Sequence, residues 1–164
     1  MGIVLVKILK RIFSYVKKLI WNIFYFGRIS IGKNVIFYSD THIVIDEKGV
    51  LKIGDNCFFN NGCALNALGC IEIGKDSIFG ENVKVYDHNH RFELNGVPFK
   101  KQGYDVKKVV IGNNCWIGSN TVILAGVTIG DNVVIGAGSI ITKDIKDNQV
   151  VVQEIKQRNL KREN

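Results

Sequence analysis

Acidic residues are absent from the first 39 positions of this chain, and only one proline, Pro98, occurs among its 164 residues. The basic residues before Asp40 account for the whole net charge of +7, because the other 15 basic residues balance the 15 acidic ones. A nucleic-acid-binding domain carries its basic residues over the folded surface. Here they gather at the N-terminus, so we expect no nucleic acid among the partners.

Paired cysteines are also lacking, because the four cysteines at positions 57, 63, 70 and 115 form no C-x-x-C motif. Disulfide-bonded scaffolds are shorter and richer in cysteine than this chain. We therefore expect reduced thiols in a cytoplasmic protein. With 46% hydrophobic and 23% charged residues, the composition is that of one globular domain with a hydrophobic core.

Long uncharged hydrophobic runs are missing even from the segment 2–26, GIVLVKILKRIFSYVKKLIWNIFYF. Its lysines and arginine exclude a membrane-spanning helix, and no small-residue cleavage site follows as in a signal peptide. At about 100° per residue, the basic side chains occupy one arc of a helix and aliphatic side chains lie opposite. This pattern is typical of a helix in a membrane interface. The alternative is a helix that docks on the domain or at a subunit contact.

The C-terminal half of the chain is built from a six-residue repeat. Each repeat contains an isoleucine, preceded by a small or β-branched residue two positions earlier and followed three positions later by a residue suited to a sharp corner. It therefore predicts a short strand, an inward aliphatic side chain and a corner. The isoleucines are Ile111, Ile117, Ile123, Ile129, Ile135 and Ile141, and the corner residues are Asn114, Asn120, Gly126, Asn132, Gly138 and Asp144.

The same pattern occurs earlier in shifted frames, as in Ile53-Gly54 and Phe79-Gly80. Stacked coils of this kind cannot bury their open ends, so we expect a cap at each end. In the tail, QEIKQRNLKRE predicts a short helix. The predicted parts are a basic amphipathic helix at 1–28, the repeat domain at 29–145 with an inserted loop at 86–108, and a C-terminal cap or tail at 146–164.

This repeat resembles that of the hexapeptide-repeat proteins. The resemblance implies an all-β fold, a left-handed parallel β-helix of triangular cross-section, across residues 29–145. Proteins of this fold include acyltransferases, zinc carbonic anhydrases and scaffolds without a reaction. The fold alone therefore does not assign a function.

The repeat lapses in the loop 86–108, which contains the only proline and two of the three histidines. A long interruption of a rigid repeat is where function is usually carried. The loop resembles one in galactoside, maltose and streptogramin acetyltransferases that carries a catalytic histidine. Alignment of GENVKVYDHNHRF without gaps places His90 at that position, and Arg91 matches the streptogramin branch. DHNH also resembles enzymes that acetylate bacterial surface polysaccharides, in which His88 would take the role.

A histidine suits acetyl transfer from acetyl-CoA to a sugar, because the hydroxyl needs a base during its attack. The resemblance implies acetyl-CoA as co-substrate, no required metal, and an oxyanion donor among the backbone N–H groups near Gly118 and Ser119. One alternative is a zinc enzyme like the carbonic anhydrases of this fold. Those use three histidines, one pair of them four residues apart, whereas this chain has His88-x-His90 and a distant His42. The other alternative is a scaffold whose loop histidines are solvated.

The resemblance also extends to residues that would bind the two substrates. CFFNNG contains the acceptor-binding asparagine, GNNCWIGSN the residues beside the pantetheine arm and thioester, and IGAGSIITKD those near the pantetheine and the phosphates. The acceptor-binding residue is Asn60, and the coenzyme-binding residues are Trp116, Ser119, Ala137, Thr142 and Lys143.

The tail departs from this family, because NQVVVQEIKQRNLKREN lacks the Gly-x-Pro turn that usually precedes a phosphate-binding basic residue. The possible replacements are Lys156, Arg158, Lys161 and Arg162. We expect a cytoplasmic homotrimeric O-acetyltransferase of bacterial surface polysaccharide biosynthesis (O-antigen, capsule or exopolysaccharide), with active sites between subunits. Its acceptor would be a sugar or lipid-linked glycan, and residues 2–26 would contact the inner face of the cytoplasmic membrane peripherally.

Overall fold

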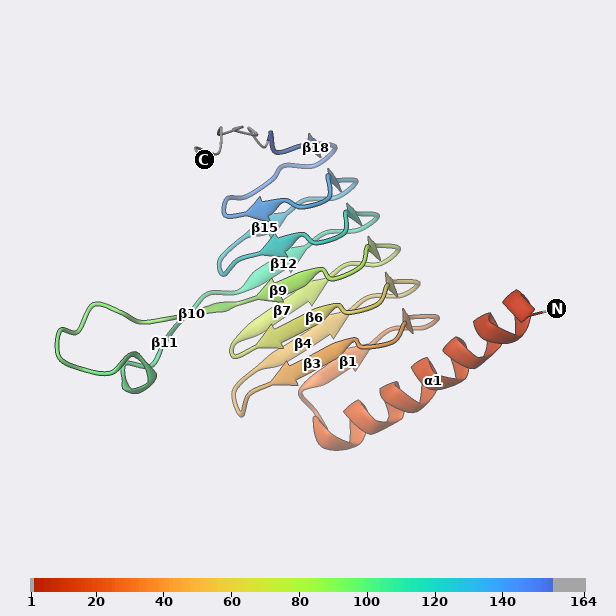
Figure 1. Ribbon diagram of the computed structural model, residues 1–164, viewed down its shortest axis with the longest axis horizontal. Coiled ribbons are helices and arrows are strands. Elements are labelled where there is room, and N and C mark those ends of the chain that lie inside the picture. Colours follow the sequence, from red (N-terminus) through yellow and green to blue (C-terminus); the bar gives the residue numbers. More distant parts are fainter. Residues whose placement is uncertain (1, 155–164) are drawn as a thin grey trace, which may run out of the picture.

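The computed structural model of the protein describes residues 2–154, which form one α-helix and a stack of coils (Figure 1). Helix α1 (Gly2–Phe24) lies against the first coil, and the last strand, β18 (Val150–Val151), lies at the opposite end of the stack. Each complete coil contributes one strand to each of three parallel sheets. The predicted all-β fold, a left-handed parallel β-helix with an N-terminal helix, is confirmed.

The three sheets are named A, B and C in the order in which the chain visits them. Sheet A contains β1 (Ile29–Ile31), β4 (Val50–Ile53), β7 (Cys70–Ile73), β12 (Val109–Ile111) and β15 (Thr128–Ile129). Sheet B contains β2 (Ile36–Phe37), β5 (Phe58–Phe59), β8 (Ile78–Phe79), β13 (Trp116–Ile117), β16 (Val134–Ile135) and β18. Sheet C contains β3 (His42–Ile45), β6 (Ala64–Ala67), β9 (Lys84–Tyr86), β14 (Val122–Ile123) and β17 (Ile140–Ile141).

The core is the column of side chains enclosed by the three sheets. All six isoleucines of the repeat are buried, as predicted, and so are the small residues that precede them. In sheet B the inward positions of the first three coils are aromatic. The ring of Phe59 stacks on that of Phe37 at 4.9 Å between centroids and on that of Phe79 at 4.4 Å. In-register strands thus align identical positions of successive coils into ladders of like side chains.

The corners use the left-handed backbone conformation that the sequence predicts. Asn114, Asn120 and Asn132 have φ between 53° and 59°, and each such residue is followed by the next strand. Asp144 was predicted in the same role, and this prediction is wrong. The last corner is two residues shorter, since Ile111 pairs with Ile129 but Ile129 pairs with Ile145. The Asp144 carboxylate instead accepts a hydrogen bond from the backbone N–H of Thr128 at 2.7 Å.

Both ends of the described stack are covered. At one end, the buried side chain of Ser14 accepts a hydrogen bond from the backbone N–H of Phe37, at 2.9 Å. At the other end, Gln153 exchanges two side-chain hydrogen bonds with the backbone of Ile140, at 2.7 and 2.8 Å. The side chain of Gln153 thereby continues the ladder of sheet C beyond β17, its last strand within residues 2–154. The predicted short helix of the tail lies almost wholly outside the described residues.

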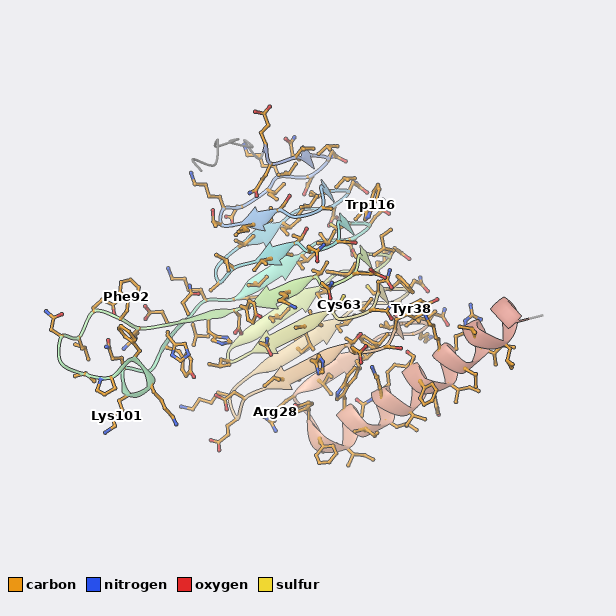
Figure 2. The ribbon with its side chains drawn as sticks, in the orientation of Figure 1. Arg28, Tyr38, Cys63, Phe92, Lys101 and Trp116 are labelled. Atoms are coloured by element: carbon orange, nitrogen blue, oxygen red, sulfur yellow. The ribbon has the colours of Figure 1, made fainter. Side chains whose placement is uncertain are left out.

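The inserted loop projects from the stack between β9 and β12 (Figures 1 and 2). It consists of a two-stranded antiparallel ribbon, β10 (His88–His90) and β11 (Tyr104–Val106), and a 3₁₀ turn, η1 (Phe99–Lys101). The buried Gln102 organises the loop tip, because its side chain accepts from Leu94 N–H and donates to the carbonyls of Leu94 and Val97.

Candidate active site

The ribbon fixes the two loop histidines at the base of the projecting loop. His88 pairs with Val106 and His90 pairs with Tyr104 across the ribbon. The Tyr104 ring lies 5.4 Å from the His88 ring and 4.4 Å from the His90 ring, measured between centroids. Both histidines point to the same side of the ribbon because they are two residues apart in a strand.

His88 is oriented by a buried carboxylate. Nδ1 of His88 lies 3.0 Å from Oδ1 of Asp87, and the side chain of His88 is only 16% exposed. A carboxylate accepts hydrogen bonds, so Nδ1 must be the donor, and Nε2 of a neutral His88 then carries the free lone pair. This pairing of a histidine with an orienting carboxylate is the arrangement required of a general base.

Asp87 is itself held by the neighbouring coil. Its carboxylate accepts hydrogen bonds from the backbone N–H groups of Leu68 at 2.9 Å and Gly69 at 2.7 Å. Asp87 is fully buried and continues the inward register of Val83 and Val85. Our sequence reasoning did not single out this residue, although an acidic side chain in an inward position of the alternating pattern was a usable signal.

His90 has a different environment. It is exposed, and its ring tilts by 42° against that of Tyr104. The next residue, Arg91, donates a hydrogen bond from Nε to Asp105 at 2.7 Å and thereby links the two strands of the ribbon. Within one chain, His88 has the geometry of a positioned base, whereas His90 has the more accessible imidazole.

The candidate residues for the acceptor and the pantetheine arm follow the corner between sheets B and C. Asn60 follows β5, Ser119 follows β13 and Ala137 follows β16; the turns of Ser119 and Ala137 are adjacent, and the turn of β8 lies between those of Asn60 and Ser119. The corner is stacked by backbone hydrogen bonds such as Gly138 N–H to Ser119 O at 2.8 Å. Trp116 projects from the outer face of sheet B and is 55% exposed (Figure 2).

One of the two predicted oxyanion donors already makes a hydrogen bond within the β-helix. The backbone N–H of Gly118 donates to the carbonyl of Ile135 at 2.8 Å, so it cannot serve an incoming oxyanion without breaking the ladder. The Ser119 hydroxyl accepts a hydrogen bond from Glu81 N–H at 3.1 Å. This packing depends on Gly80, where an added Cβ would lie 2.6 Å from the Ser119 Oγ. Because the Gly118 N–H is already bonded, the backbone N–H of Ser119 is the better candidate for the oxyanion donor.

The candidate phosphate-binding residues lie on another corner. Thr142 and Lys143 follow β17, between sheets C and A, and both are exposed. They line a shallow groove of about 210 Å³ at the C-terminal end of the stack. The other predicted phosphate ligands, Lys156, Arg158, Lys161 and Arg162, lie outside the described residues. His88 stands at the same corner as Lys143, in an earlier turn.

The candidate residues therefore fall into two groups that one chain does not bring together. One group follows the corner between sheets B and C, and the other, with both histidines, follows the corner between sheets C and A. The whole width of sheet C separates the two corners. A site that uses both groups requires a second copy of the chain.

The other reactive groups of the described residues are the cysteine thiols and the side chains that could bind a metal. All four cysteines are free thiols, and burial raises the pKa of Cys57 and Cys63 to about 11. These thiols are therefore protonated at neutral pH and poor nucleophiles. Within residues 2–154, His, Cys, Asp and Glu side chains form no group of three or more that could hold a metal ion.

Comparison with known proteins places this geometry in a family. The family described as "Bacterial transferase hexapeptide (six repeats)" matches residues 108–143. The galactoside O-acetyltransferase of Escherichia coli K12 is 34% identical over 141 residues, which are 82% of this chain and 58% of the relative. The putative lipopolysaccharide biosynthesis O-acetyl transferase WbbJ of the same organism is 30% identical over 134 residues, 76% of this chain and 67% of the relative.

The solved structures agree. A galactoside acetyltransferase in complex with coenzyme A superposes with a TM-score of 0.66 at 35% identity, over 74% of this chain and 58% of the other. The fold and the repeat thus define a left-handed β-helix of the hexapeptide class. The chain belongs to the hexapeptide-repeat acetyltransferase family. It spans only 58% of the length of the E. coli galactoside O-acetyltransferase.

Proposed function

We propose that this protein is an acetyl-CoA-dependent O-acetyltransferase that modifies a sugar hydroxyl in a bacterial surface polysaccharide. The observation that carries the proposal is the Asp87–His88 pair at the base of the inserted loop, in a chain of this family. Relatives named as galactoside, lipopolysaccharide and colanic acid acetyltransferases support a sugar acceptor. A neighbour in complex with coenzyme A supports the acyl donor.

The proposed chemistry assigns the base to the histidine pair, and the geometry favours His88. Nε2 takes the proton of the sugar hydroxyl while its oxygen attacks the thioester carbonyl carbon of acetyl-CoA. The tetrahedral intermediate then collapses, the carbon–sulfur bond breaks, and the leaving thiolate recovers the proton from the imidazolium. Asp87 keeps Nδ1 protonated and stabilises the imidazolium. His90, which the alignment favours, is the alternative base.

The proposed assembly is a homotrimer, with each site between two subunits. The outer face of sheet B is an unbroken apolar column, in which each side chain is paired in register with the next. Sheet A is polar by contrast, with Glu72 bridging Lys52 and Lys108. An apolar sheet face of this kind needs a cover, and another copy would also join the two groups of candidate residues. The column consists of Ile36, Phe58, Ile78, Trp116, Val134 and Val150.

The proposed location is the cytoplasm, close to the inner face of the membrane, where lipid-linked glycans are built. No helix in residues 2–154 combines the length and apolarity that crossing a bilayer requires. The contact of residues 2–26 with a membrane therefore concerns its surface. A scaffold without a reaction is the competing account, and the following two experiments separate it from an enzyme.

Coenzyme A should change the fluorescence of Trp116 in a Trp21→Phe variant in a saturable way. Lys143→Ala should weaken the affinity about 10- to 100-fold, because a charged hydrogen bond to a phosphate is worth about 1.5–3 kcal/mol. Lys48→Ala, which removes the same charge from an exposed site on the first coil, should leave the affinity unchanged. An unaltered affinity in Lys143→Ala would move the phosphate contact to Lys156 or Arg158. No saturable change at millimolar coenzyme, with the oligomer intact, would favour the scaffold.

Cells without the gene should lose acetyl groups from a surface polysaccharide. Mass spectrometry of the purified glycan is expected to show repeat units lighter by the mass of one acetyl group. The gene should restore the mass, and a His88→Ala, His90→Ala double variant should not. An unchanged glycan together with intact coenzyme binding would redirect the search to a free sugar acceptor.

A further inference from the structure

Helix α1 packs on the β-helix through its basic side. Lys17 Nζ donates a hydrogen bond to the carbonyl of Tyr38 at 3.2 Å, and Lys18 Nζ donates to that of Val35 at 3.1 Å. The buried Ser14 lies on the same side of the helix as these two lysines. In the part of the chain that the structure describes, no coil lies beneath the first one, so its carbonyls would otherwise lack partners from the stack. The two lysine side chains donate hydrogen bonds to these carbonyls, so the basic side of α1 caps the first coil.

The opposite side of α1 is apolar and uncovered. An ordinary surface helix buries its apolar stripe against the core, and here that stripe points away from the stack. A continuous exposed apolar surface of this size marks an interaction site. Its side chains, each between 44% and 74% exposed, are Leu5, Val6, Ile8, Leu9, Ile12, Phe13, Tyr15, Val16, Leu19, Ile20, Ile23 and Phe24.

Basic grooves border this apolar face on both sides. On one side Lys10 and Lys17, with Asp40 beside them, line a groove of about 260 Å³ between α1 and Tyr38. On the other, Arg11 and Lys18 line a groove of about 310 Å³. Positive charge thus lies at the two edges of the apolar face, at the level where the helix meets the first coil.

We propose that α1 lies in the surface of an anionic bilayer, with its apolar face among the acyl chains and lipid phosphates in the two basic grooves. This order of layers, apolar, then cationic, then folded domain, matches a membrane interface. A second copy of the chain is a poorer occupant of the face. Two helices packed face to face would bring four basic edges together, and Asp40, in one groove of each copy, is the single acidic residue that lines these grooves.

The proposal also sets the height of the candidate site above the membrane, a step that rests on the proposed function. The Asp87–His88 pair follows β9, in the third coil from α1. With coils about 4.8 Å apart, the pair stands about 10 Å above the first coil. A base at that height is within reach of the first sugars of a lipid-linked glycan, which explains why an acetyltransferase would be held at the membrane.

Flotation of the full-length protein with vesicles tests the proposal. Binding to phosphatidylcholine vesicles that contain phosphatidylglycerol is expected, with weaker binding to pure phosphatidylcholine and at high salt. Ile12→Glu combined with Leu19→Glu should lower the partition at least ~10-fold, because both side chains would carry charge into the acyl region. Thr128→Glu combined with Val152→Glu adds the same charge at exposed positions away from α1 and should leave the partition unchanged.

A second pair of variants tests the grooves. Lys10→Ala and Arg11→Ala should each reduce the partition to phosphatidylglycerol vesicles about fivefold at low salt. The proposal is overturned if the wild-type protein stays unbound, or if the two glutamates on α1 leave binding unchanged. It is also overturned if light scattering without lipid shows an assembly that those glutamates split, since a second copy would then cover the face. Vesicle binding needs no coenzyme, so none of these three outcomes bears on acetyl transfer.

Discussion

His88→Ala is expected to lower the turnover number by ~10²–10⁴-fold while coenzyme A binding stays nearly intact. The physical reason is that the sugar hydroxyl loses the base that removes its proton, whereas His88 is not among the residues proposed to bind coenzyme A. Steady-state kinetics with acetyl-CoA and titration of Trp116 fluorescence measure the two quantities separately. Loss of coenzyme binding together with turnover would indicate a misfolded loop instead.

His90→Ala is the matched control, since it removes an imidazole from the same ribbon two residues away. A mild effect of His90→Ala beside a severe one of His88→Ala supports the buried pair as the base. The reverse result would return the role to His90, in agreement with the alignment, and leave His88 as a structural residue. If both variants keep full activity, the acetyltransferase proposal fails.

Asp87→Asn tests how much the carboxylate that orients His88 contributes to turnover. An asparagine keeps the size of the side chain but offers His88 a weaker acceptor and no charge to stabilise the imidazolium. We expect turnover to fall less than in His88→Ala, with coenzyme affinity unchanged. A side chain that only supports the loop would lower stability without lowering the turnover of the folded protein.

The repeat could be predicted from the sequence because each position of a coil has one physical requirement. Ile111 and its successors had to be aliphatic to fill a narrow core, and the corner asparagines had to tolerate positive φ. The prediction for Asp144 was wrong because the last corner is shorter, and residue types do not reveal how many residues join two strands. Asp87 was missed for a different reason: it continues the inward alternation of Val83 and Val85 as a buried carboxylate, whereas the repeat predicts an aliphatic side chain there.

The loop and α1 could not be predicted in the same way. The ribbon joins residues 88–90 to 104–106 through long-range pairing, which local sequence does not encode. The amphipathic pattern of α1 predicted two faces, but not which face meets the domain. That choice depends on the unpaired carbonyls of Val35 and Tyr38, and these exist only once the first coil has formed.

Phe59→Ala should lower the free energy of unfolding by about 3–5 kcal/mol, the range for removing a buried phenyl ring. Phe59 is fully buried and is the middle ring of the stack that joins three coils. Its removal leaves a cavity between Phe37 and Phe79 that rigid, hydrogen-bonded coils cannot close. Because Trp21 of α1 packs edge-on against Phe37 at 5.0 Å between centroids, the loss should also loosen the cap.

Urea unfolding at one fixed protein concentration measures the effect, since oligomers unfold in a concentration-dependent way. Phe92→Ala removes the same ring from a loop position that is 72% exposed and should change stability by less than about 0.5 kcal/mol. Phe59→Leu should fall between the two, because leucine refills most of the cavity but cannot stack. A Phe59→Ala protein as stable as the Phe92→Ala control would mean that the sheet ladders alone hold the coils together, and that the aromatic column only fills space.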